Sequence, residues 1–229
     1  VSNTDGGITS NVRANQTAGF SIVSYTGNGN AGATVGHGLS ATPEWVVCKD
    51  RDDTDNWQIY HARAQTSGAK LLKFTDAAAS SNNGPWNNTA PTNSVITLGG
   101  GGTNDNGNDH IMYCWTPVAG YSAFGEYAGN SSSDGPFVFT GFRPKFLIVK
   151  VYDQADHWVM WDSVRGSTNV NNLPLYPNLS NSESANISRQ VDLLSNGFKL
   201  RATDNSINGS HNYIYIAFAE HPLKTARAR

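Results

Sequence analysis

The stretch "FSIVSYTGN" occupies residues 20–28, and a similar stretch, "SAFGEYAGN", occupies residues 122–130. Each alternates apolar and polar residues and then continues into an aromatic residue, a small residue and Gly-Asn. Alternation with a period of two predicts a strand with one buried face, and Gly-Asn predicts a turn. The recurrence of this phrase about a hundred residues later indicates that the chain contains one β unit twice.

Four further blocks recur in the same order, at offsets of about 101 to 103 residues. They are "TPEWVVCKD" (42–50) with "RPKFLIVKV" (143–151), "NWQIYHA" (56–62) with "HWVMWDS" (157–163), "SVITL" (94–98) with "GFKLR" (197–201), and "HIMYCW" (110–115) with "NYIYIAF" (212–218). We interpret this as a tandem duplication, with one domain over residues 19–118 and another over 119–229. We expect residues 1–18 to be an N-terminal linker, and the chain to be a piece of a longer protein.

Composition favours an all-β protein. Charged residues make up only 15% of the chain, whereas it holds 25 Asn and 23 Gly, which suit tight turns between short strands. The fold we expect is two tandem antiparallel β-sandwich domains, jelly-roll-like, with several strands each. Residues 191–201, "VDLLSNGFKLR", predict a hairpin about Asn196-Gly197, although Ile187, Val191 and Leu194 would also fit one face of a helix.

Charge and hydropathy exclude two classes of partner. Lys and Arg total 16 and Asp and Glu total 18, so a net charge of -2 gives no basis for binding nucleic acid. No apolar run approaches the roughly 20 residues that span a bilayer, so we expect no membrane insertion.

The two cysteines occupy positions where the second copy has small apolar residues. Cys48 aligns with Val149, and Cys114 with Ala217. Two buried free thiols are therefore expected, with a single disulfide between neighbouring strands as the alternative.

The sequence offers no catalytic motif, and we expect neither an enzyme nor a bound cofactor. The histidines lack a metal-ligand spacing, and no nucleophile-and-base arrangement is evident. The acidic turn "DRDDTD" is interpreted as a solvated hairpin turn. Calcium, which takes six to eight oxygen ligands, is the lesser alternative there, held by Asp50, Asp52, Asp53 and Asp55.

Aromatic residues in polar loops are the candidate binding residues. Trp86 lies in "SNNGPWNNTAP" beside Asn83 and Asn87, and Tyr176 lies in the corresponding loop of the second copy. An aromatic face flanked by amides can bind a sugar, because the ring covers C–H faces and the amides bond hydroxyls. The alternative for both rings is that they fold back and cap the end of the sandwich.

Taken together, these blocks resemble a duplicated C-terminal module of tail fibre and tail-associated structural proteins of marine tailed bacteriophages. The blocks carrying the resemblance span residues 19–222, and include "GFSIVSYTGNGNAGATVGHGLSATPEWVVCKDRD" (19–52), "YCWTPVAGYSAFGEYAGNSSSDGPFVFTGFRPKFLIVK" (113–150), "SNGFKLR" (195–201) and "IYIAFAEHP" (214–222). The resemblance implies a virion location, a homo-oligomer (a trimer above all) and attachment to a bacterial surface, with cell-surface polysaccharide as the receptor. A purely structural subunit or spacer of a virion appendage or extracellular filament is the alternative. A polysaccharide depolymerase ranks third.

Overall fold

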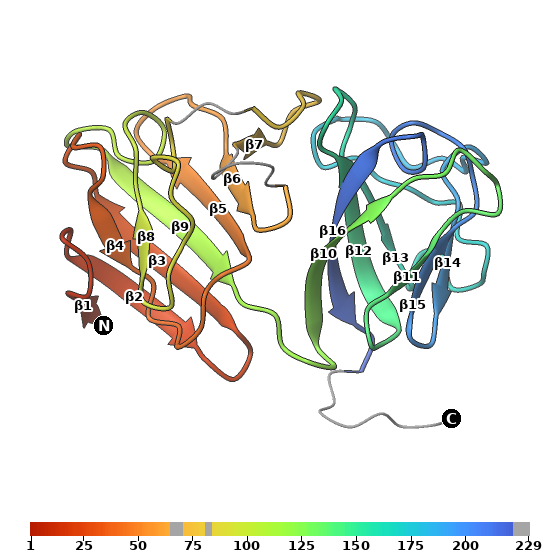
Figure 1. Ribbon diagram of the computed structural model, residues 1–229, viewed down its shortest axis with the longest axis horizontal. Coiled ribbons are helices and arrows are strands. Elements are labelled where there is room, and N and C mark those ends of the chain that lie inside the picture. Colours follow the sequence, from red (N-terminus) through yellow and green to blue (C-terminus); the bar gives the residue numbers. More distant parts are fainter. Residues whose placement is uncertain (65–70, 81–83, 222–229) are drawn as a thin grey trace. The chain divides into compact units, whose positions relative to one another are not determined.

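The computed structural model describes residues 1–64, 71–80 and 84–221, and no helix occurs in these ranges. The chain divides into two compact units. Unit 1 comprises Val1–Phe74 and Ala79–Pro117, and unit 2 comprises Thr75–Ala78 and Val118–Arg229. Figure 1 shows the strands of both units. The expectation of an all-β protein with antiparallel sheets is confirmed.

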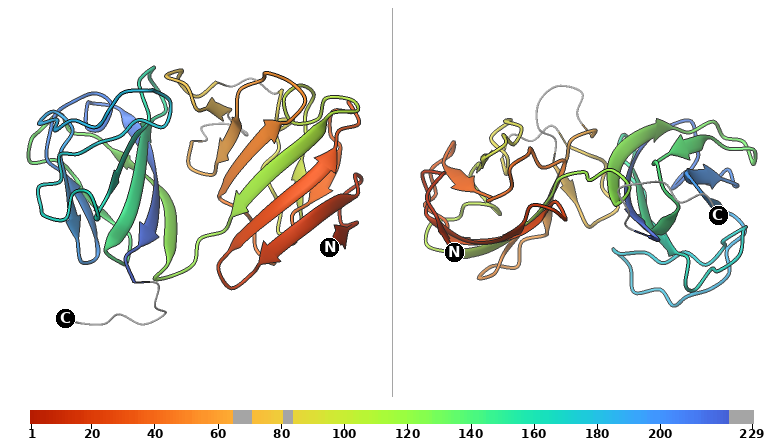
Figure 2. Two further views of the ribbon diagram at one scale, coloured as in Figure 1. Left: turned by 180° about the vertical axis from the view of Figure 1, so that it is seen from behind. Right: turned by 90° about the horizontal axis from the view of Figure 1, so that it is seen from below.

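Unit 1 is built on a seven-stranded sheet whose neighbouring strands all run antiparallel, and Figure 2 shows this sheet from behind. In spatial order its strands are β1 (Ser2–Asn3), β2 (Ser10–Asn15), β3 (Phe20–Thr26), β9 (Asp109–Trp115), β5 (Trp45–Asp50), β6 (Gln58–His61) and β7 (Leu72–Lys73).

A second, two-stranded sheet of β4 (Thr34–Gly36) and β8 (Val95–Thr97) completes unit 1. One buried apolar cluster draws residues from both sheets, including Val23 and Val46 from the large sheet and Val35 and Ile96 from the small one. Two sheets sharing one core are the defining feature of a β-sandwich.

Unit 2 follows the same plan. A four-stranded sheet contains β10 (Ser122–Ala128), β16 (Asn212–Ala219), β12 (Pro144–Val151) and β13 (Val159–Asp162), and a three-stranded sheet contains β11 (Phe137–Phe139), β15 (Gly197–Leu200) and β14 (Val191–Leu194). Its core again takes side chains from both sheets, among them Leu147 and Trp161 from the first and Leu193 and Phe198 from the second.

The expectation that residues 1–18 form a linker is wrong. Residues 10–15 form β2, which pairs with β3 over five residues, and Ile8 bridges to Val35. Val12, on β2, is buried in the core of unit 1. The alternation in "SNVRAN" was too short and too polar to stand out, and only pairing with β3 makes it a strand.

The hairpin expected near Asn196-Gly197 is confirmed, one residue earlier than predicted. Leu194 pairs directly with Gly197, which leaves Ser195 and Asn196 as the two turn residues. Gly197 is needed for close approach, because a Cβ there would lie 2.1 Å from the carbonyl oxygen of Val138. Ile187 is 77% exposed, so the alternative of a helix face is wrong.

In each unit the repeated Tyr-x-Gly-Asn sequence hydrogen-bonds to a loop that lies far away in the sequence. In unit 1 the Tyr25 hydroxyl donates to Thr103 O at 2.6 Å, and the Asn28 N–H donates to Asn104 Oδ1 at 2.9 Å. Between them, Gly27 admits the loop, since a Cβ there would lie 2.3 Å from the carbonyl oxygen of Asp105.

Unit 2 repeats these contacts, and its two hydrogen bonds have the same lengths. The Tyr127 hydroxyl donates to Ile207 O at 2.6 Å, and the Asn130 N–H donates to Asn208 Oδ1 at 2.9 Å. A Cβ on Gly129 would lie 1.9 Å from the carbonyl oxygen of Gly209. The duplication stays a prediction, and these matched contacts support it.

Both cysteines are free and buried. Burial raises the pKa of the Cys48 thiol to about 12, and it also raises the pKa of Cys114. The thiols therefore serve as compact core side chains, as the alignment with Val149 and Ala217 predicts.

Candidate functional site

Trp86 does not present an exposed ring. Its side chain is only 1% exposed and belongs to the core of unit 1, where it packs edge-on against Tyr60 at 6.2 Å. The glycine-rich loop holds it there, because Gly99 N–H and Thr103 Oγ1 both donate to Pro85 O, at 2.9 and 2.6 Å. The expectation of a sugar-binding indole at Trp86 is wrong, and the alternative of a ring folded into the sandwich describes the structure.

The remaining loop candidates are not assembled into an open aromatic site. Asn83 lies outside the described residues, and Asn87 is exposed in a turn with a φ of 46°. Tyr176 is half-buried against the core of unit 2, and the Arg189 guanidinium carbon lies 5.4 Å from its ring centroid. Because that cation and the core contact the ring, Tyr176 does not offer a free face.

A different set of aromatic residues gathers on the outer side of the seven-stranded sheet, away from the core. We call this set the aromatic face. It consists of Phe20 on β3, Tyr113 and Trp115 on β9, Trp45 on β5 and Trp57 just before β6.

Strand register explains why these side chains meet. Phe20 lies opposite Trp115, and Trp115 lies opposite Trp45, so three rings form a row across three strands. Ring centroids are 5.0 Å apart in the first pair and 4.1 Å in the second, and Tyr113 stands 6.2 Å from Trp115 and 6.3 Å from Trp57. Trp57 is 37% exposed, Trp45 is buried, and the other three are half-buried.

An open hollow adjoins the aromatic face at the β2–β3 hairpin. Its volume is about 520 Å³, and its lining comes from Arg13, Ala14, Asn15, Gln16, Phe20 and Ile22. The lining thus combines an aromatic ring with a guanidinium and two amide side chains, which donate or accept hydrogen bonds.

Sequence reasoning missed the aromatic face, although a signal for it was present. The outward positions of an antiparallel sheet are usually polar, yet the outward positions of "FSI" (20–22) and "YCW" (113–115) are aromatic or aliphatic. Apolar residues on both faces of an alternating strand indicate a second contact surface besides the core.

The four aspartates of the acidic turn do not converge on one point. Asp50 Oδ1 accepts the N–H groups of Asp52 and Asp53 at 2.9 and 3.2 Å, and Asp52 Oδ2 accepts the Asp109 N–H at 2.7 Å. Asp55 is exposed. Their carboxylates chiefly hold the turn in shape, so the structure does not assemble the calcium set suggested by the sequence.

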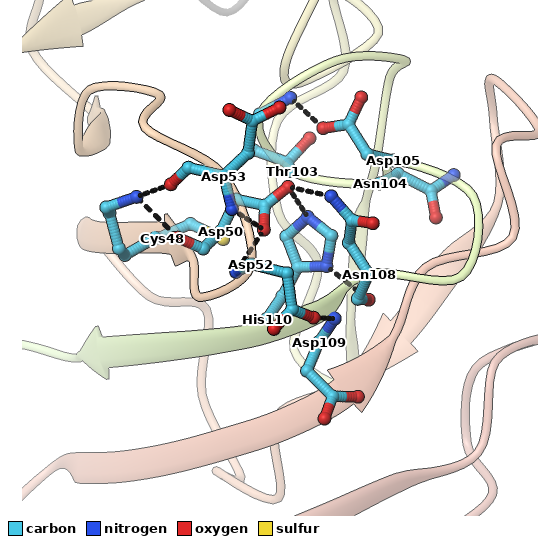
Figure 3. A network of polar contacts seen from close by, with 12 residues as sticks. Cys48, Asp50, Asp52, Asp53, Thr103, Asn104, Asp105, Asn108, Asp109 and His110 are labelled. Carbon is cyan, nitrogen blue, oxygen red and sulfur yellow. Dashed lines mark hydrogen bonds and ion pairs between the residues drawn. The ribbon is translucent and has the colours of Figure 1, made fainter.

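One of these aspartates, Asp50, takes part in a buried polar network shown in Figure 3. Its Oδ2 accepts a hydrogen bond from Asn108 Nδ2 at 2.8 Å and lies 3.5 Å from His110 Nε2. Burial alone would raise the pKa of Asp50, but the hydrogen bonds from Asn108, Asp52 and Asp53, together with the neighbouring His110, outweigh it and hold that pKa below its usual value.

None of the described residues forms a helix that could span a membrane.

Fold and surface together define a protein of two β-sandwich units with an aromatic patch on one sheet. The chain belongs to the family of domain of unknown function DUF7483, whose model matches residues 1–222. No curated protein and no solved structure matches the chain.

Proposed function

We propose that this protein is a non-enzymatic attachment module of a bacteriophage tail fibre, located in the virion, which binds polysaccharide on a bacterial surface. The observation that carries the proposal is the aromatic face on unit 1. Four of its five rings keep part of their surface in contact with water, which is costly for apolar rings gathered on one sheet, so they indicate a contact surface.

The chemistry of this surface suits a saccharide. Aromatic rings pack against the apolar C–H faces of a sugar, and the neighbouring Arg13, Asn15 and Gln16 supply hydrogen-bonding groups for its hydroxyls. A shallow site of this kind binds weakly. Assembly as a homo-oligomer, with a trimer favoured, would raise its avidity by about 10²–10⁴.

The test is a binding screen of the purified protein against bacterial envelope glycans and intact cells, with Trp57→Ala and Phe20→Ser alongside. Serine is a conservative choice at Phe20, since Ser122 begins β10 in the corresponding place. Both variants should fold and lose binding by at least about 10-fold, in line with the loss of aromatic contacts.

A matched control removes an exposed aromatic residue elsewhere. Phe137→Thr leaves the aromatic face intact, so its affinity per site for an isolated oligosaccharide should equal that of the unaltered protein, even where assembly through β11 is weakened. Binding lost in Phe137→Thr but kept in the other two variants would contradict the location, and failure of the unaltered protein to bind any glycan or cell would contradict the function.

A purely structural role in a virion appendage or extracellular filament is the second candidate, and one observation favours it. Phe137 and Phe139 are 46% and 66% exposed on β11, an edge strand of its sheet. Exposed apolar residues on a strand edge are a common means of self-association.

The double variant Phe137→Thr/Phe139→Thr tests this role. Loss of the oligomer in analytical ultracentrifugation, with glycan binding absent in the unaltered protein, would support the structural role. An unchanged oligomer would show that Phe137 and Phe139 on β11 do not mediate self-association.

A further inference from the structure

His110 carries a buried nitrogen without a hydrogen-bond partner. The side chain is fully buried on β9, and its ring stacks on Tyr25 with centroids 5.2 Å apart and planes 9° from parallel. Within the described ranges, no hydrogen-bond partner reaches Nε2. A buried polar atom left unpaired costs roughly 1–3 kcal/mol, so such an atom calls for a physical explanation.

The opposite ring nitrogen determines what Nε2 can do. Nδ1 lies 3.0 Å from the carbonyl oxygen of Asn108, which can only accept, so Nδ1 carries the hydrogen. In the neutral ring Nε2 then carries the lone pair, and it lies 3.5 Å from Asp50 Oδ2 (Figure 3). Histidines that bind metals typically donate their other N–H to a backbone carbonyl in this way.

Asp105 brings a third ligand to the same place. Within the described parts of the chain, Asp50, Asp105 and His110 are the one group of at least three His, Cys, Asp or Glu residues whose ligand atoms lie close enough to share an ion, all within 4.8 Å of one another. Donors at about 2.0–2.1 Å from a tetrahedral zinc ion stand about 3.4 Å apart, close to the 3.5 Å between Nε2 and Oδ2. Asp105 is half-buried on a loop, and the distances from its carboxylate to the other two ligand atoms would need to shorten by at most about 1.4 Å.

The local charge favours a cation. Two carboxylates converge here with a ring nitrogen. Lys49, next to Asp50 in the sequence, directs its Nζ to the backbone oxygens of Asp50 and Asp53. Carboxylate together with imidazole suits Zn²⁺ and neighbouring divalent transition metals rather than Ca²⁺, which prefers oxygen ligands alone.

Unit 2 shows that the fold does not require these residues. Asp50 pairs with His110 in β5–β9, and the pairing in the corresponding place of β12–β16 is Val151 with Tyr213. The Tyr213 hydroxyl has hydrogen-bond partners nearby in the sequence: it donates to Asn205 O and accepts the Gly209 N–H, each at 2.6 Å. Where unit 1 places three ligand side chains, unit 2 has valine, tyrosine and glycine.

We propose that Asp50, Asp105 and His110 bind a divalent transition-metal ion of the Zn²⁺ class, with water completing its coordination. The ion ties the loop that carries Asp105 to the ends of β5 and β9. Its role is structural, because it stabilises the loop that Tyr25 and Gly27 also hold. This inference is independent of the proposed attachment function.

Titration of the metal-stripped protein with Zn²⁺ in a calorimeter tests the proposal, and Co²⁺ serves as a spectroscopic probe. One ion should bind per chain, raise the melting temperature and, as Co²⁺, give d–d bands without a sulfur-to-metal charge-transfer band. Asp105→Asn should weaken binding by at least roughly 10-fold. Asparagine can still accept the Gly102 N–H that Asp105 Oδ2 accepts, so this variant should fold.

Asp109→Asn is the matched control, an exposed carboxylate four residues further along that takes no part in the cluster. It should bind the metal as the unaltered protein does. The proposal is overturned if Zn²⁺ does not bind, which would leave a water or a proton on Nε2. It is equally overturned if Asp105→Asn binds unchanged, if both variants lose binding alike, or if a charge-transfer band assigns the ion to Cys48.

Discussion

At the scale of single residues, buried hydroxyl and amide groups decide how loops attach to the sandwiches. Tyr25 and Tyr127 are both buried, and each donates to one carbonyl oxygen of a loop nearly eighty residues away, at 2.6 Å. Neither carbonyl oxygen belongs to a strand ladder. A single hydroxyl therefore determines whether a buried backbone acceptor is satisfied.

Tyr127→Phe is expected to destabilise the protein by about 1–3 kcal/mol, because Ile207 O is left without its donor. Denaturant unfolding followed by fluorescence measures the change. Tyr121→Phe is the control: this half-buried ring packs edge-on against Phe218, and its loss of a hydroxyl should cost no more than about 0.5 kcal/mol. Equal decreases in the free energy of unfolding of the two variants would show that the hydrogen bond from Tyr127 to Ile207 O does not stabilise the protein.

The thiols of Cys48 and Cys114 are expected to be unreactive in the folded protein. Both are buried with raised pKa values, about 12 for Cys48, and only the thiolate attacks a disulfide reagent. Reaction with a chromogenic disulfide at pH 8 should be at least about 100-fold slower than in denaturant, where two thiols per chain should react. Fast reaction of either thiol in the native protein would be inconsistent with this burial.

At the scale of elements, glycines set how closely a loop can approach a strand. Gly129 follows β10, and its position beside Gly209 O leaves no space for a side chain. The sequence correctly predicts the strand and the turn here, since alternation and Gly-Asn are local signals. It does not reveal that the glycine serves a loop eighty residues away, because close approach is a property of the folded chain.

Gly129→Ala is expected to cost at least about 2 kcal/mol, since a Cβ would lie 1.9 Å from a backbone oxygen and the loop would have to shift. Thermal unfolding provides the measurement. Gly100→Ala should be nearly neutral, because nothing lies within 4 Å of a Cβ at that position. A neutral Gly129→Ala would mean that the loop of unit 2 is held loosely.

At the scale of the whole molecule, sequence patterns gave the all-β class, most strand positions and the buried thiols. They failed where a local pattern has two outcomes. A tryptophan in a polar loop can face water or the core, and contacts of Gly99 and Thr103 decide the matter for Trp86. The aromatic face and the Asp50–Asp105–His110 cluster depend on strand register and loop packing, which no single stretch of sequence specifies.

The buried tyrosine hydroxyls and cysteine thiols predict a loss of stability at alkaline pH. Burial raises the pKa of Tyr25 and Tyr127 well above 10.0, and that of Cys48 from 9.0 to about 12. From about pH 9 upward the unfolded chain therefore releases protons that the folded chain retains. Because the unfolded chain then binds fewer protons than the folded chain, the free energy of unfolding falls as pH rises. Lys150 acts in the opposite direction: burial lowers its pKa to about 8, which adds stability between pH 8 and 10.5.

One lysine is opposed by at least two tyrosines and two thiols, so the net change should be a decrease above about pH 9. Denaturant unfolding at intervals from pH 7 to 11 measures it. In the variant Cys48→Val/Cys114→Ala, which installs the side chains that unit 2 has at these places, the decrease should begin about one pH unit later, because only the tyrosines remain to drive it. The same onset in both proteins would show that the thiols are not protected from ionisation by the fold, and a stability that keeps rising to pH 11 would show that the buried lysine outweighs the tyrosines.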